Sequence, residues 1–345
     1  MYSFNNDYSE GTHPRILEAL MQTNLEQNIG YSLDSHTSHA ISLMKAAIGR
    51  EDADIHCLVG GTQTNALVIN AALRPHQAVI CASTGHINVH ETGAIEATGH
   101  KVLAVDSPDG KLTPAMILQV LAHHTDEHMV QPRMAYISNT TEIGTQYSKA
   151  ELQELSRTCR QHGLYLFLDG ARLGAALTSP INDLTLEDIA NLTDIFYIGG
   201  TKNGALFGEA LVILNPELKT DFRFLIKQHG AMLAKGWLLG IQFETLFSDG
   251  LYWELAEHAN QMAAKLKHGI ESLGYSFASD SYSNQLFPIF PDSVIEALSH
   301  EFLFSSNTRE DDSHSSIRLV TSWATRETAV TDFLKTLSSL TTKTR

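Results

Sequence analysis

The chain has 345 residues, of which 43% are hydrophobic and 18% are charged, a composition typical of an ordered globular protein rather than a disordered or fibrous one. Its 39 acidic and 24 basic side chains give a net charge of −15, which disfavours nucleic acid and anionic membrane surfaces as partners. The charge therefore favours a small-molecule substrate. At this length we expect a large domain, residues 12–247, and a small α+β domain formed by residues 1–11 and 248–345.

The cysteines and the first residues indicate the compartment. Cys57, Cys81 and Cys159 show no CxxC spacing, so neither a disulfide framework nor a zinc knuckle is indicated. The first ten residues lack the basic segment and apolar run of a signal peptide. No stretch approaches the roughly 20 apolar residues that a membrane span requires. We therefore expect a cytoplasmic protein.

Short apolar runs alternate with helix-period segments from about residue 12 onward. This alternation predicts an α/β fold with a mostly parallel sheet flanked by helices. A helix is expected over Lys149–His162, because Ser148 and Glu151 form a capping box and Gly163 ends the apolar stripe. The expected strands are Ala78–Ala82, Lys101–Val105, Met134–Ser138, Leu164–Leu168, Asp194–Ile198 and Ala210–Leu214.

A lysine follows one of these strands in the sequence GGTKNG, residues 199–204. Open α/β sheets bind ligands at the carboxyl ends of their strands. Among small neighbours, Lys202 can approach a planar ring, and partial desolvation lowers an amine pKa enough for attack on a carbonyl carbon. An ordinary surface turn is the alternative interpretation.

Two further polar segments follow apolar runs. Asp169 begins DGAR directly after Leu164–Leu168; its carboxylate can pair with a protonated ring nitrogen, while Arg172 offers a positive fork to a carboxylate. The segment GGTQTN, residues 60–65, follows Ile55–Val59 and opens an expected helix over Ala66–Leu73. Helix-start N–H groups can bind a phosphate. The alternative for Asp169 is an acid that caps the next helix. The alternative for GGTQTN is a tight connection between a strand and a helix.

Taken together, these segments resemble the threonine aldolase and β-eliminating lyase family of fold-type I pyridoxal-phosphate enzymes. The resemblance extends over most of the chain and also includes NNDYSEG at the start, GHINVHETGA, and RLVTSW near the end. It implies pyridoxal 5′-phosphate as cofactor, a fold-type I large domain with a small C-terminal domain, and a homodimer or homotetramer with shared active sites.

The resemblance also implies roles for individual residues. Lys202 corresponds to the Schiff-base lysine, Asp169 to the partner of the pyridine nitrogen, and His86 to the histidine that stacks on the ring. The other implied cofactor contacts are Gly61, Thr62, Thr201, Arg172 and, from a neighbouring subunit, Lys235. The implied substrate contacts are Asn6, Tyr31, Arg172 and Arg318.

The sequence departs from the family pattern at two places. Where many members have a second histidine, this chain carries Glu142, so either His86 or Glu142 is the expected catalytic base. The segment YSLD, residues 31–34, replaces a YGDD-like segment, and Tyr31 is expected to reach the active site of a neighbouring subunit.

Retro-aldol cleavage of L-threonine, L-allo-threonine and related β-hydroxy-α-amino acids to glycine and an aldehyde is the implied reaction. A β-eliminating lyase, an aminotransferase and an inactive cofactor-binding protein are the alternatives. Two histidine-rich groups, residues 123–128 and 86–91, lack the HExxH spacing of a zinc site, and we expect no catalytic metal.

Overall fold

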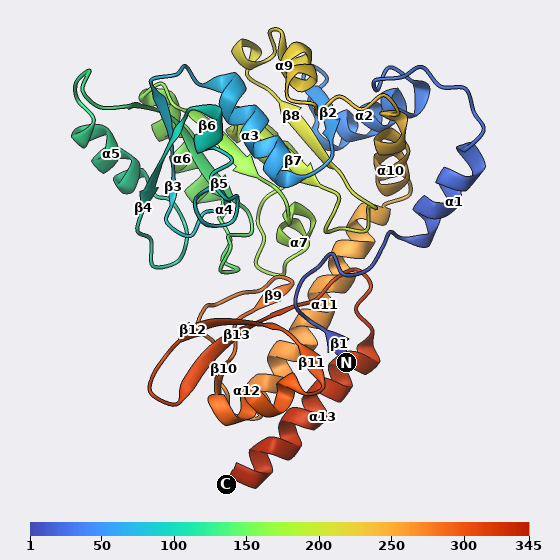
Figure 1. The fold of residues 1–345 in the computed structure, drawn as a ribbon, viewed down its shortest axis with the longest axis vertical. Helices are drawn as coiled ribbons and strands as arrows, with labels where there is room; N and C mark the ends of the chain where they lie inside the picture. Colours follow the sequence, from blue (N-terminus) through green and yellow to red (C-terminus); the bar gives the residue numbers. More distant parts are fainter. Residues whose placement is uncertain (345) are drawn as a thin grey trace.

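The computed structural model describes residues 1–344 and contains a large sheet flanked by helices above a smaller C-terminal part (Figure 1). The seven strands of the large sheet run in the order β2-β8-β7-β6-β5-β3-β4. All neighbours are parallel except for the antiparallel pairs of β8 with β7 and β2, which confirms the expected mostly parallel sheet. The strands are β2 Asp54–Leu58, β3 Gln77–Ala82, β4 Lys101–Val105, β5 Gln131–Ser138, β6 Tyr165–Asp169, β7 Ile195–Gly199 and β8 Glu209–Ile213.

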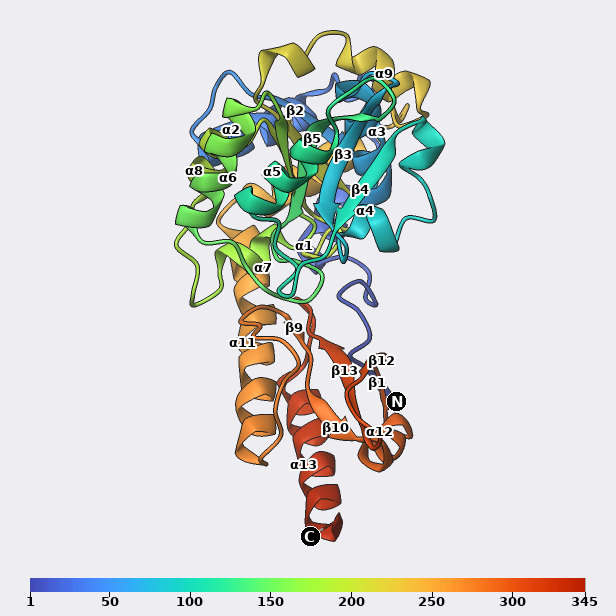
Figure 2. The same cartoon turned by 90° about the vertical axis from the view of Figure 1, so that its left-hand side faces the viewer.

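Helices cover both faces of this sheet (Figure 2). Helices α2, α5, α6, α8 and α10 contribute to the core on one face, and α3, α4 and α9 to the core on the other. The helices of this part are α1 Pro14–Thr23, α2 Ser35–Ile48, α3 Gly61–Ala72, α4 His86–Val89, α5 Pro114–His123, α6 Lys149–Gln161, α7 Leu173–Leu177, α8 Leu186–Leu192, α9 Phe222–Gln228 and α10 Trp237–Phe247, with short 3₁₀ turns at η1 Glu96–Thr98 and η2 Pro216–Leu218.

Two of these helices test the sequence predictions directly. In α6, the capping box of Ser148 and Glu151 is confirmed, and Gly163 adopts φ 67° just beyond the helix end. Helix α3 was predicted to begin at Ala66 but begins at Gly61, because Gly60 is extended and the polar residues after it form the first helical turn. The shift is functionally relevant, since it brings the helix N-terminus to the glycines.

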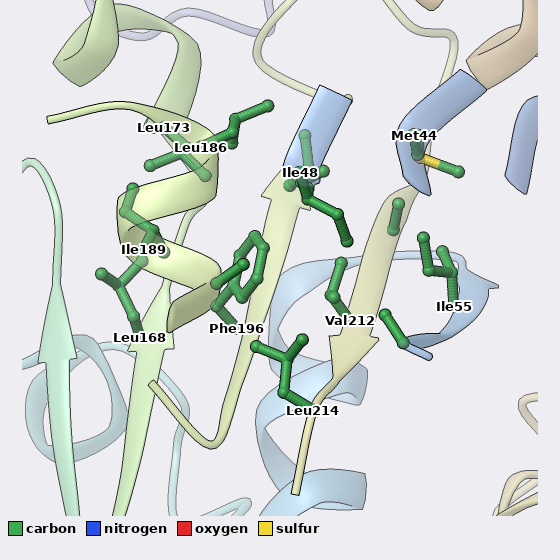
Figure 3. Packing of buried hydrophobic residues seen from close by; sticks show 14 of the residues in the cluster. Met44, Ile48, Ile55, Leu168, Leu173, Leu186, Ile189, Phe196, Val212 and Leu214 are labelled. Carbon is green, nitrogen blue, oxygen red and sulfur yellow. The ribbon is translucent and has the colours of Figure 1, made fainter. Parts of the chain in front are cut away.

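The central strands are apolar on both faces, as expected for a sheet covered on both sides. Figure 3 shows Leu168, Phe196 and Val212 of neighbouring strands packed beneath Ile48 and Ile189. Each is buried, and full burial of one such side chain contributes about 1.5–3 kcal/mol. This rigid core holds the carboxyl ends of the strands in place.

The C-terminal part has its own hydrophobic cluster, which includes Phe4, Leu266, Ile317 and Phe333. Its elements are α11 Leu251–Ser272, β9 Gln285–Leu286, β10 Ile289–Pro291, α12 Asp292–Ser299, β11 Phe302–Leu303, β12 Ser305–Arg309, β13 His314–Val320 and α13 Glu327–Thr344. The N-terminal strand β1, Tyr2–Ser3, pairs with β11. This pairing supports our proposal that residues 1–11 and 248–345 form one small domain. In the part of the chain described, no helix is both long and apolar enough to cross a membrane.

Candidate active site

A cavity of about 290 Å³ lies at the carboxyl ends of the central strands. Lys202, Asp169, Gly61 and Thr62 line it together with His86. The three polar segments of the sequence therefore meet in one place. The other lining residues are Tyr8, Val59, Gly60, Ala171, Tyr197, Thr201 and Glu209.

The N-terminus of α3 forms one end of this cavity. The first intrahelical hydrogen bond runs from the Thr64 N–H to the Gly60 oxygen, at 3.1 Å. The N–H groups before it have no intrahelical partner and carry the positive end of the helix dipole. A Cβ at Gly61 would lie 3.2 Å from the Tyr197 hydroxyl, so glycine keeps this approach open. The geometry fits a phosphate group.

Asp169, the last residue of β6, is buried and lines the cavity. It accepts hydrogen bonds from the Tyr136 hydroxyl at 2.5 Å, the Asn65 amide at 3.2 Å and the Ala171 N–H at 2.9 Å. Burial raises the pKa of Asp169, but the nearby His86 and the hydrogen bonds from Tyr136, Tyr197 and the Ala171 N–H outweigh burial and hold the pKa below its usual value. A fixed buried carboxylate of this kind fits a protonated pyridine nitrogen.

His86 is oriented from behind by Glu91. The His86 Nδ1 lies 2.8 Å from Glu91 Oε1, and the Asn65 amide donates to the same oxygen at 2.8 Å. Because a carboxylate only accepts, Nδ1 carries the hydrogen and Nε2 is left as the acceptor of the neutral ring. Asn65 thus links the carboxylate behind His86 to Asp169.

Lys202 stands in the tight loop after β7. A Cβ at Gly199 would meet the Ala171 oxygen at 2.4 Å, so only glycine permits this close approach of the two loops. Burial, followed by the charge of Arg172, lowers the pKa of Lys202. Within residues 1–344 its amine has no carboxylate oxygen within 4.0 Å. A lysine of lowered basicity and no direct ion pair suits a nucleophilic amine.

The two arginines have different surroundings. Arg172 is held by Asp7 through Nε at 2.7 Å and Nη2 at 3.0 Å, so much of its guanidinium is already engaged. Arg318 makes only long hydrogen bonds, to the Asn5 oxygen at 3.4 Å and the Ser305 hydroxyl at 3.3 Å, and its buried Nε has no partner in the described chain. Neither arginine lines the cavity, and the guanidinium of Arg318 is the less engaged of the two.

Of the remaining predicted residues, Thr201 lines the cavity, whereas Asn6 and Glu142 do not. Asn6 accepts from the Tyr8 N–H and the Ser9 hydroxyl, both at 3.0 Å, and shapes the N-terminal turn. The Thr201 hydroxyl accepts from the Gly208 N–H at 3.0 Å. Glu142 accepts hydrogen bonds from the backbone N–H of His86 at 2.9 Å and from the Ser138 hydroxyl at 2.7 Å.

Tyr31 and Lys235 do not line the cavity of their own chain. The Tyr31 N–H donates to the oxygen of Ala234, the residue before Lys235, at 3.1 Å. A second cavity, also about 290 Å³, is lined by Tyr31 and by Leu33, Arg223 and Met232. No group of three metal-binding side chains occurs in the portion of the chain that the structure describes.

Sequence reasoning missed several residues of this site. Tyr136 and Tyr197 belong to apolar strands, where nothing in the sequence marks a tyrosine as a hydrogen-bond partner. Asp7 and Tyr8 belong to NNDYSEG, a segment that only the family resemblance indicated as part of the site. Glu209 opens an apolar strand seven residues after Lys202, a spacing that no simple motif records.

Comparison with known proteins agrees with this geometry. The family model described as β-eliminating lyase matches residues 7–292. The low-specificity L-threonine aldolase of Pseudomonas aeruginosa is 32% identical over 302 residues, which cover 86% of each chain. The corresponding protein of Saccharomyces cerevisiae is 27% identical over 282 residues, covering 76% of this chain and 71% of its own.

Solved structures extend the comparison. The threonine aldolase of Leishmania major is 54% identical with a TM-score of 0.98, over 99% of this chain and 100% of that one. Aspartate aminotransferase from Thermus thermophilus has a TM-score of 0.74 at 14% identity, over 99% and 91% of the two chains, and shares the fold alone. The expected fold-type I architecture is thereby confirmed. The chain belongs to the β-eliminating lyase family, the family of pyridoxal-phosphate-dependent lyases that includes the threonine aldolases.

Proposed function

We propose that this protein cleaves the Cα–Cβ bond of L-threonine, L-allo-threonine and related β-hydroxy-α-amino acids to give glycine and an aldehyde. The observation that carries the proposal is the single cavity shared by Lys202, Asp169 and the N-terminus of α3. The threonine aldolases among the relatives support the choice of substrate.

The residues of the cavity fit pyridoxal 5′-phosphate. When bound, the cofactor supplies an electron sink for the bond broken at Cα. The N–H groups of Gly61 and Thr62 would hold its phosphate, and Asp169 would hold a proton on its pyridine nitrogen. Lys202 would bind it covalently through Nζ. The lowered pKa of Lys202, caused first by burial, favours the neutral amine that this attachment requires.

Arg318 is assigned to the substrate carboxylate, because its guanidinium lacks a carboxylate partner within the described residues. Burial lowers the pKa of Arg318 most, and the charge of the nearby Arg172 lowers it further. The paired cations attract an amino-acid carboxylate, while Asp7 fixes the orientation of Arg172. This arrangement orients the substrate before any bond is broken.

We assign the removal of the β-hydroxyl proton to His86 rather than Glu142. The Nε2 of His86 is free to accept a proton, since Glu91 occupies Nδ1. Glu142 is buried behind the histidine, outside the lining of the cavity. Burial raises the pKa of Glu142, which would suit a base. However, its Oε1 already accepts hydrogen bonds from the backbone N–H of His86 and the hydroxyl of Ser138.

We further propose a homo-oligomer in which Tyr31 and Lys235 enter the active site of a neighbouring copy. Neither residue lines the cavity of its own chain, and Tyr31 contacts Ala234, the residue before Lys235. The segment around Tyr31 exposes Leu25, Ile29 and Leu33, an apolar stretch of the kind that subunit contacts cover. The three free, buried cysteines also support the expected cytoplasmic location.

Absorbance spectroscopy tests the assignment of Lys202. Wild-type protein with cofactor is expected to show a visible absorbance band, and borohydride reduction is expected to attach the cofactor permanently to the chain. Lys202→Ala is expected to lose this covalent attachment. Lys101→Ala, which removes an exposed lysine of β4, is the matched control and keeps the band. Persistent covalent cofactor in Lys202→Ala would rule out the assignment.

Product analysis tests the reaction. L-threonine is expected to yield an aldehyde and glycine in an aldehyde-coupled assay. Pyruvate from L-serine in place of the aldehyde would indicate a β-eliminating lyase, and keto-acid formation from L-alanine would indicate an aminotransferase. A bound cofactor with no turnover of any of these amino acids would indicate an inactive binding protein.

A further inference from the structure

Glu209 is a buried carboxylic acid that faces the same cavity as Lys202. It is the first residue of β8, is 4% exposed, and pairs in register with Gly199 of β7 and Leu58 of β2. The neighbour on β7 has no side chain, so nothing on that strand fills the space beside the carboxyl group. Glu209 and Lys202 both line the cavity.

A structural role alone does not account for a carboxyl group at this position. Glu209 Oε2 accepts from the Gly200 N–H at 3.1 Å, but the same N–H also lies 3.0 Å from the Gly208 oxygen. The loop is therefore closed by backbone contacts even without Glu209. A buried carboxylate is costly unless it has a compensating charge, and Lys202 is the cation that acts on it.

The charges around Lys202 and Glu209 have opposite effects on the pKa values of these two groups. Lys202 faces the cation of Arg172 and the carboxylates of Asp7, Asp169 and Glu209. Burial raises the pKa of Glu209 to about 8, and Asp169 adds to this effect, while Lys202 and the hydrogen bonds of the loop oppose it. Among the described residues, the hydroxyls of Tyr197 and Tyr252 also lie close enough to Glu209 to interact with its charge. Burial thus disfavours both the ammonium of Lys202 and the carboxylate of Glu209, and favours the neutral form of each.

We propose that Glu209 is the positioning residue that stores the proton of Lys202. The proposal rests on the proposed role of Lys202 as the amine that holds the cofactor. When the amine becomes a nucleophile, one N–H bond of Lys202 breaks and one O–H bond of Glu209 forms, so that an ammonium and a carboxylate become a neutral amine and a neutral acid. The reverse transfer restores the ammonium when the amine is released. The amine and the carboxyl group line the same cavity, and the lysine side chain has four rotatable carbons with which to reorient.

Competitive acetylation of the apoprotein tests this coupling without cofactor or turnover. Acetic anhydride reacts with neutral amines, so the labelling of Lys202 across pH, read by peptide mass spectrometry, follows its deprotonation. Lys101 serves as an internal standard. Glu209→Gln keeps an oxygen for the Gly200 N–H but removes the charge. We expect its Lys202 midpoint to fall by about 1 pH unit or more, as loss of a nearby opposite charge does.

Glu209→Asp keeps the carboxylic acid and is expected to restore a midpoint close to that of the wild type. Coinciding midpoints for wild type and Glu209→Gln would overturn the proposal. The wild type alone gives an independent check if the variants do not fold: a coupled pair titrates in two steps, and a single step would also overturn it. Because labelling needs no turnover, a protein that fails to cleave threonine yet shows the shift would contradict the proposed function and leave the pair intact.

Discussion

The buried ion pair between Asp7 and Arg172 is expected to stabilise the fold as well as the active site. The Asp7 side chain is fully buried and that of Arg172 is 13% exposed. Both Asp7 oxygens accept from the guanidinium, and the Asn284 amide adds a third hydrogen bond at 2.9 Å. In Asp7→Asn, an NH₂ group replaces one of these oxygens and meets a donor.

The expected loss is large because one partner of a buried pair is removed while the other remains. Breaking such a pair costs about 3–5 kcal/mol, most of it from the uncompensated charge left behind. The remaining amide oxygen still accepts one hydrogen bond, which favours the lower end of this range. The exposed pair of Arg15 and Asp249, at 3.1 Å with the aspartate side chain 84% exposed, should contribute less than about 1 kcal/mol.

Urea unfolding of the apoprotein, followed by tryptophan fluorescence, compares Asp7→Asn with Asp249→Asn. We expect a clearly lower midpoint for the first variant and nearly the wild-type midpoint for the second. Equal stabilities of the two variants would refute the reasoning, because they would mean that burial of the pair makes no difference.

The pH dependence of this pair has a definite sign. Burial raises the pKa of Asp7, but Arg172 and Lys202 outweigh burial and hold it below the usual value. A lowered folded-state pKa gives stability that is present above the unfolded pKa of about 4 and is lost as pH falls through the folded pKa. The stability difference between wild type and Asp7→Asn should therefore shrink below about pH 4.

Two further predictions concern the substrate site and the thiols. Arg318→Gln should raise KM for L-threonine by about 10–100-fold, because a charged hydrogen bond to the substrate is lost, while the cofactor band stays unchanged. The control Arg326→Gln should leave KM unchanged. An unchanged KM in Arg318→Gln would mean that another residue binds the carboxylate. Burial raises the pKa of Cys57, Cys81 and Cys159 to about 12, so iodoacetamide at neutral pH should label none of them until the protein is unfolded, and labelling of the native protein would contradict their burial.

The sheet could be predicted from the sequence because its strands are short apolar runs separated by polar segments. Six expected strands agree with β3 to β8 to within a few residues. The error at α3 has a physical cause: the polar residues of its first turn gave no apolar periodicity, and glycines disfavour a helix in isolation. Tertiary placement against the sheet overrides this local preference.

The cavity was predictable in part. The motif lysine, the aspartate that ends β6 and the glycines that open α3 meet there because all lie at the carboxyl ends of strands, a rule that the sequence alone can apply. The partners that tune them were not predictable, since Asn65 bridges Glu91 and Asp169 from a position that reads as an ordinary polar residue of a helix. Contacts between side chains distant in sequence are fixed by packing rather than by local pattern.

The cavity concentrates opposite charges in a chain whose overall charge is −15. That field repels an anionic cofactor at long range, but salt screens it beyond about 8 Å, so binding depends on nearby groups. The N-terminus of α3 and Lys202 supply positive potential, while Asp169 and Glu209 hold a negative charge or a proton at fixed points. Asp169 and Glu209 accept hydrogen bonds from different donors, so the two carboxyl groups can differ in protonation. This separation lets one small cavity hold a ring nitrogen protonated beside an amine that must lose its proton.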